Sequence, residues 1–169
     1  LFRTAYFEHP DYVPLLKRAA TAWRDIEKES RETLLEMPGV LMAGGADSAL
    51  ISGTRSAAKD HALPLHNLTH AQAAKQFPWL KLDPSMEMLI EPDSGFIYAD
   101  RALRAFLSGA KAHGAEVHEQ TPIRGVHFGG AKIGLVTAHG KLAFDRIIAA
   151  PGAYASALLG EVGALVTPL

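Results

Sequence analysis

The feature that most constrains the fold is a set of three short apolar segments, joined by two-residue turns, in the second half of the chain. The segments are residues 122–128, 132–138 and 141–148, and the turns between them are Gly129–Gly130 and His139–Gly140. Glycine in a two-residue loop allows the tight turn that connects neighbouring antiparallel strands. The sequence therefore predicts a β-meander over residues 121–150.

The last of these strands continues into residues 144–159, FDRIIAAPGAYASALL. Residues 146–150 predict a buried strand, Pro151–Gly152 a turn, and residues 153–159 the first turns of a helix. Because glycine has no Cβ, this arrangement lets the backbone approach a bound nucleotide closely. It is also ordinary in α/β proteins, so a nucleotide site and a plain connection both remain open.

Four helices are predicted before the meander. They are residues 13–30 after an N-cap at Asp11, a helix from Asp47 to about residue 61, a short helix after Thr69, and residues 101–113 after Asp100. The first has apolar residues at a 3.6-residue spacing. Thr69 and Gln72 form a capping-box pattern, and Gly114 is expected to end the last helix.

Short apolar runs among these helices predict strands. The runs are residues 40–43, 86–91, 95–99 and 115–119, and residues 64–68 predict a short extended piece. Residues 86–91 and 95–99 flank the turn at 92–95 and predict a paired hairpin. Residues 115–119 follow the last helix and complete a strand–helix–strand unit. Glu91 and Asp93, beside the turn, are expected to be solvated.

The composition limits the classes of function. The 169 residues allow one domain or two small ones, and 48% apolar with 21% charged residues is typical of a soluble globular protein. A formal net charge of −1 argues against a nucleic-acid partner, and no apolar run is long enough to span a membrane. The absence of cysteine excludes disulfides and thiolate nucleophiles in this chain and suits a cytoplasmic location.

Both ends of the sequence predict an internal piece of a longer protein. The chain begins at Leu1 rather than at Met and ends at Leu169, shortly after an expected turn. No signal peptide is expected before the first predicted element.

Neither a metal site nor a catalytic group is predicted. His66 and His70 are four residues apart, a spacing that could share a metal on one helix, but Pro64 and Thr69 interrupt that helix. No Ser/His/Asp set or pair of carboxylates stands out.

Taken in order, the segments resemble the sarcosine oxidase and N-methyltryptophan oxidase family. LFRTAYFEHPDYVPLLKRAATAWRDIEKES resembles its Arg-x-Ala-Tyr run with the following helix, and MPGVLMAGG resembles its next strand. EPDSGFIYADRALRAFLSGAKAHGAEVHEQTPIRGV resembles its E-P-x-S-G turn, helix and strand, and FDRIIAAPGAYASALL resembles a later strand and turn. The resemblance is collinear along the whole chain and extends to the wider D-amino-acid-oxidase-like superfamily.

The resemblance implies a mixed α/β (α+β) fold. One part would be an FAD/NAD(P)-binding-type fold with the β-meander, and the other an antiparallel-sheet substrate domain. Residues 1–97 would belong mostly to the substrate domain and residues 98–169 to the FAD-binding domain. The chain has no G-x-G-x-x-G pattern for the pyrophosphate, so FAD is implied for the full-length protein and the chain alone is expected to bind it poorly.

The resemblance also implies roles for five residues. Arg3 matches the arginine that pairs with the substrate carboxylate, to which a guanidinium offers fixed donors in a fork. Tyr6 would line the same site or pack in the core. Ile123 matches a residue whose backbone meets the adenine, and Gly152 and Ala153 match small residues packed against the nucleotide.

The implied function is oxidation of the C–N bond of a secondary amine, an N-methyl amino acid, by FAD with O₂ as acceptor. Two alternatives remain open: an amino-acid dehydrogenase of the same superfamily with another acceptor, and a non-catalytic α+β domain. The expected partner is a small-molecule amine, and the sequence predicts no oligomeric state.

Overall fold

The computed structural model describes residues 1–128 and 130–155 and contains two compact units, each of which is described by itself. The first unit is Leu1–Ala115 and the second begins at Glu116. Two predictions fall wholly or partly outside the described residues: the Gly129–Gly130 turn and the helix over residues 153–159. The domain boundary after residue 97 stays a prediction, because compactness within this chain does not show which functional domain each segment joins.

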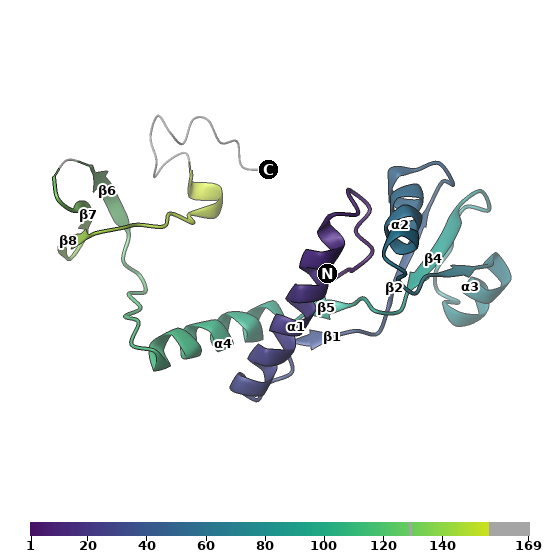
Figure 1. The fold of residues 1–169 in the computed structure, drawn as a ribbon, viewed down its shortest axis with the longest axis horizontal. Helices are drawn as coiled ribbons and strands as arrows, with labels where there is room; N and C mark the ends of the chain where they lie inside the picture. Colours follow the sequence, from purple (N-terminus) through teal and green to yellow (C-terminus); the bar gives the residue numbers. More distant parts are fainter. Residues whose placement is uncertain (129, 156–169) are drawn as a thin grey trace. The chain divides into compact units, whose positions relative to one another are not determined.

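The first unit contains four α-helices and five strands (Figure 1). The helices are α1 (Tyr12–Ser30), α2 (Ala49–Asp60), α3 (His70–Gln76) and α4 (Ala99–Ala112). The strands are β1 (Leu35–Glu36), β2 (Val40–Gly44), β3 (His66–Leu68), β4 (Glu87–Glu91) and β5 (Phe96–Ile97). All four predicted helices are therefore confirmed, with starts within two residues of those expected.

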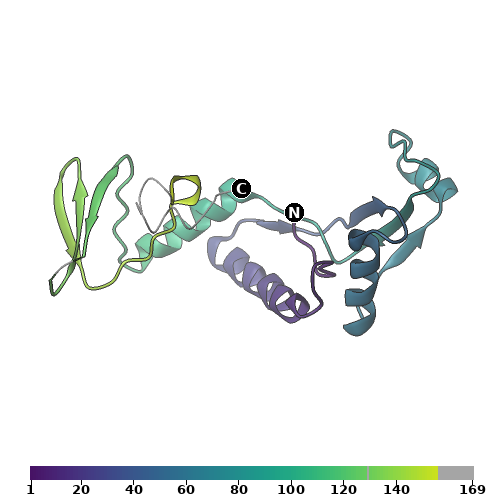
Figure 2. The ribbon, with the colours of Figure 1, turned by 90° about the horizontal axis from the view of Figure 1, so that it is seen from above.

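A three-stranded antiparallel sheet forms the centre of this unit, in the order β2-β4-β3. Helix α2 lies against β2 and β4 in both views (Figures 1 and 2). Met42, Ile51 and Leu89 are buried between helix and sheet, where they form the hydrophobic core. Burial of such apolar surface is the main force that holds a helix on a sheet.

The remaining pair, β1 and β5, is also antiparallel, with Leu35 opposite Ile97. The predicted hairpin between residues 86–91 and 95–99 is therefore wrong: β4 pairs with β2 and β3, and β5 pairs with β1. The turn between them binds other segments instead, since Gly39 donates its N–H to the Ser94 carbonyl at 2.8 Å. The turn is therefore bound to another segment of the chain, and β4 and β5 belong to different sheets.

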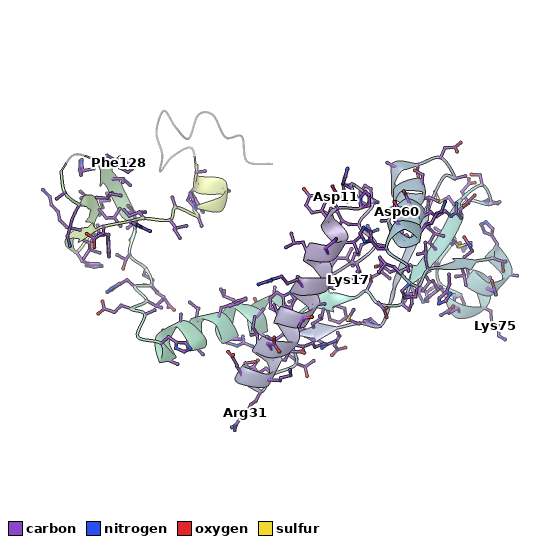
Figure 3. All side chains as sticks on the ribbon, in the orientation of Figure 1. Asp11, Lys17, Arg31, Asp60, Lys75 and Phe128 are labelled. Carbon is purple, nitrogen blue, oxygen red and sulfur yellow. The ribbon has the colours of Figure 1, made fainter. Side chains whose placement is uncertain are left out.

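The second unit holds the meander of β6 (Ile123–His127), β7 (Ile133–Thr137) and β8 (Gly140–Phe144). Both pairings are antiparallel, so this prediction is confirmed. Gly140 has φ +134°, a value that favours glycine at the β7–β8 turn. Phe128, just after β6, is 77% exposed (Figure 3).

Two predicted strands are wrong. Residues 115–119 and 146–150 contain no strand, and Ile148 is 95% exposed rather than buried. A strand exists only when a neighbouring strand takes up its backbone hydrogen bonds. Neither segment has such a partner among the residues that the structure describes, so the strand–helix–strand unit is not closed.

The helix caps were predicted in part. Thr69 and Gln72 make the expected capping box, and Gly114 follows α4 with φ +86°. For α2 the N-cap is Ser48, whose hydroxyl accepts the Ile51 N–H at 3.3 Å, rather than Asp47. Asp11 and Tyr98 precede α1 and α4, and neither makes a side-chain cap hydrogen bond. Because α4 begins at Ala99, Asp100 lies inside the helix rather than at its N-cap.

Two helical glycines allow a matched test of packing. A Cβ on Gly53, in α2, would overlap the Phe7 carbonyl, whereas a Cβ on Gly109, in α4, would meet nothing within 4 Å. We expect Gly53→Ala to destabilise the fold by about 1–3 kcal/mol through overpacking, and Gly109→Ala to stabilise it by about 0.5–1 kcal/mol. Urea unfolding of both variants measures this, and a shift of the same sign in the two would contradict it.

Glu27, near the end of α1, binds the chain that leads into β1. Its Oε1 accepts the N–H groups of Leu34 at 2.7 Å and Leu35 at 2.9 Å, and its Oε2 accepts Arg24 Nη1 at 2.7 Å. Burial alone would raise the pKa of this carboxyl. The hydrogen bonds from Leu35, Arg24 and Leu34 outweigh that effect and hold the pKa below the ordinary glutamate value.

A lowered folded-state pKa at Glu27 makes stability depend on pH. The carboxylate's contribution is complete above the unfolded-state pKa and is lost as the pH falls through the lower folded-state pKa. We expect Glu27→Gln to lose less stability than the wild type between about pH 6 and about pH 3, measured by urea midpoints. Glu29→Gln, an exposed change on the same helix, should keep the wild-type dependence. Equal losses in all three proteins would refute this role.

Candidate functional site

The N-terminal segment lies against the turn that follows β4. Phe2 forms an isolated antiparallel bridge with Gly95: its N–H donates to the Gly95 carbonyl at 2.7 Å, and Gly95 donates in return at 2.8 Å. The Thr4 hydroxyl donates to the Asp93 carbonyl at 3.2 Å. A Cβ on Gly95 would overlap the Glu36 carbonyl, so only glycine fits where these segments meet.

Glu91, the last residue of β4, is buried beneath this segment, with only 1% of its surface exposed. Its Oε1 accepts the N–H of Thr4 at 2.7 Å and the N–H of Ala5 at 2.6 Å. The expectation that Glu91 is solvated is therefore wrong. A signal was present, because Glu91 lies two residues after the buried Leu89 and so on the same face of the strand.

Arg3 extends from the same segment toward α2, and only 10% of its side chain is exposed. Its Nη2 donates to the Ala5 carbonyl at 3.1 Å and to the Thr54 hydroxyl at 3.0 Å. Its Nε lies 3.8 Å from Glu91 Oε2, and its guanidinium carbon lies 5.3 Å from the centre of the Phe7 ring. The guanidinium is thus held on three sides.

Thr54 is a structural support for Arg3. It lies on α2, is fully buried, and its hydroxyl hydrogen points to the sulfur of Met42 at 3.6 Å. Because that hydrogen is engaged, the hydroxyl oxygen faces the guanidinium as an acceptor. No pattern in the sequence indicates this contact, because it joins residues far apart in the chain.

These contacts restrict how Arg3 could meet a ligand. Nη2 carries two hydrogens, and both have acceptors. Within residues 1–128 and 130–155, Nη1 has no acceptor. A carboxylate would therefore be met by Nη1 rather than by the Nη1–Nη2 fork that the arginine alone suggests.

Tyr6 and Arg3 line the same hollow, whose volume is about 300 Å³. The Tyr6 ring packs against Tyr12, with the ring centres 5.1 Å apart, and lies 6.2 Å from Phe7. The structure therefore brings the two predicted substrate residues together. Tyr6 thus lines the hollow beside Arg3 and packs against neighbouring aromatic rings, and its role toward a substrate stays a prediction.

The predicted cofactor residues lie in the second unit. Ile123 begins β6 opposite Thr137, and a β-bulge follows it. Gly152 begins a 3₁₀ turn (Gly152–Tyr154) with φ +56°, and a Cβ there would meet nothing within 4 Å. Ala153 is exposed. An apolar hollow of about 410 Å³ is lined by both Ile123 and Pro151, so it joins β6 to the residue before Gly152.

The described residues contain no group of three or more His, Cys, Asp or Glu side chains that could hold a metal. His66 lies in β3 and His70 begins α3, so they do not share a helix. In the part of the chain that the structure describes, every helix is too short or too polar to cross a membrane.

Comparison with known proteins shows the family to which this chain belongs. A family model described as FAD dependent oxidoreductase matches residues 1–169, so the chain belongs to that family. Monomeric sarcosine oxidase of Bacillus sp. (strain B-0618) is 31% identical over 96% of this chain and 42% of its own length. N-methyl-L-tryptophan oxidase of Citrobacter koseri is 26% identical over 96% of this chain and 44% of its own length. The predicted family is confirmed.

Solved structures show the same fold. A variant of NikD, an unusual amino acid oxidase, has a TM-score of 0.83 and 23% identity over 93% of this chain and 41% of its own. L-proline dehydrogenase from P. horikoshii has a TM-score of 0.76 and 21% identity over 95% of this chain and 43% of its own. The chain thus spans less than half the length of the relatives that it matches.

Proposed function

We propose that this chain is part of an FAD-dependent oxidoreductase that oxidises the C–N bond of a secondary amine, an N-methyl amino acid, with O₂ as acceptor. The observation that carries the proposal is the Arg3 guanidinium, held by buried contacts with Nη1 left for an acidic ligand, on the segment that resembles sarcosine oxidase. A cytoplasmic location is part of the proposal.

In this proposal, Arg3 neutralises the substrate carboxylate and fixes the distance of the amine from it. Tyr6 closes one side of the same hollow and limits the size of the group beside the carboxylate. Both act on binding and orientation rather than on bond breaking. FAD, when bound, supplies the two-electron acceptor for the C–N bond.

Two features of the second unit support a site for the adenosine side of FAD. Ile123 lies at the edge of an apolar hollow, which suits a flat base. Gly152 has open space beside its α-carbon, so its backbone can approach a ligand closely. We infer that the main chain of Ile123 and the small residues Gly152 and Ala153 contact the nucleotide.

A dehydrogenase with a different electron acceptor is the second candidate. It is favoured by the likeness in fold to L-proline dehydrogenase. The two candidates make the same use of Arg3 and differ in the electron acceptor.

Oxygen uptake by the full-length protein separates these candidates. We expect oxygen consumption and peroxide with N-methylglycine or N-methyltryptophan, and little with proline or pipecolate. Oxidation that proceeds only with an artificial acceptor would favour the dehydrogenase. No oxidation of any of these amines, with or without such an acceptor, would contradict the proposed function.

Arg3→Gln tests the carboxylate partner. We expect kcat/KM for an N-methyl amino acid to fall roughly 10- to 100-fold, since a hydrogen bond between charged groups contributes about 1.5–3 kcal/mol. Arg18→Gln, which removes a positive charge from an exposed position on α1, is the matched control and should retain activity. Steady-state kinetics, corrected for flavin content, measure both, and equal losses in the two variants would exclude a specific role for Arg3.

A further inference from the structure

We propose that Glu91 is a positioning residue for substrate binding. It fixes the backbone that carries Arg3, and its charge sets how strongly the guanidinium attracts a substrate carboxylate. The inference rests on the proposed function, because it acts through Arg3.

Two backbone hydrogen bonds to Glu91 hold the segment that carries Arg3. One oxygen of Glu91 accepts two consecutive N–H groups, from Thr4 and Ala5, directly after Arg3. Hydrogen bonds to an ionised acceptor are shorter and stronger than neutral ones. They determine the direction in which the chain leaves Arg3, and therefore where its side chain begins.

The other carboxylate oxygen of Glu91 lies beside the Arg3 guanidinium. Oε2 of Glu91 and Nε of Arg3 are both buried, lie 3.8 Å apart, and have no hydrogen-bond partner among the described residues. Two opposite charges at this distance in a poorly hydrated site interact strongly. Glu91 therefore offsets part of the positive charge that a substrate carboxylate would meet.

The two roles can be separated by substitution. In Glu91→Gln the amide oxygen can still accept both N–H groups, but the negative charge is gone. In Glu91→Ala both the acceptor oxygen and the negative charge are gone. Glu87→Gln is a matched control, because Glu87 lies on the same strand and pairs with Arg55 instead of Arg3.

The experiment compares two amines that differ in the carboxylate. The full-length, FAD-loaded protein would be assayed with N-methylglycine and with N-methylethylamine, and the ratio of their kcat/KM values would be the readout. We expect Glu91→Ala to lower this ratio roughly tenfold. We expect Glu91→Gln to lower KM for N-methylglycine roughly threefold, with little change for N-methylethylamine. Glu87→Gln should match the wild type.

The outcomes distinguish a failure of the positioning role of Glu91 from a failure of the proposed function. If Arg3→Gln removes the preference for N-methylglycine while both Glu91 variants keep the wild-type ratio, the positioning role is overturned and the proposed function stands. If the wild type has no preference for N-methylglycine, the proposed function fails and the inference fails with it. If Glu91→Ala does not fold, Glu91→Gln decides alone: an unchanged KM for N-methylglycine would overturn the role of the charge, and with it the inference.

Discussion

The hydrogen bonds between the buried Glu91 carboxylate and the N-terminal segment are the interaction on which the rest of the first unit depends. It lies at the end of the central strand β4 and binds the backbone of the N-terminal segment through Thr4 and Ala5. Helix α2 contacts the same N-terminal segment. Gly53 lets the Phe7 backbone lie against the helix, and Thr54, the next residue, supports Arg3. Strand, helix and N-terminal segment are thereby fixed to one another at the candidate substrate site.

Local structure could largely be predicted from the sequence, because its causes are local. The four helices follow from the spacing of apolar residues, and the capping box at Thr69 and Gln72 follows from two residues on adjacent turns. The meander follows from short strands with glycine between them, and Gly140 has the backbone angle that this pattern requires. In each case the determining residues lie within a few positions of the element they form.

Structure that depends on distant residues was not predictable in the same way. Residues 86–91 and 95–99 looked like a hairpin because they are close in sequence, yet their partners are β2, β3 and β1. Residues 115–119 and 146–150 have the composition of strands but no partner in the described chain. The exposed Ile148 shows the consequence, since an apolar side chain is buried only where another element covers it.

The candidate substrate site explains why a costly buried charge stands at the end of β4. Burying an ion pair is rarely stabilising compared with apolar residues of similar size. Here an apolar side chain would leave the N–H groups of Thr4 and Ala5 without an acceptor, at about 1–3 kcal/mol for each buried group. A neutral acceptor would satisfy both N–H groups but would leave the positive charge of Arg3 without a neighbouring negative charge. Only a carboxylate both holds the segment and balances the guanidinium, so the architecture of the turn and the charge of the proposed binding site have one common cause.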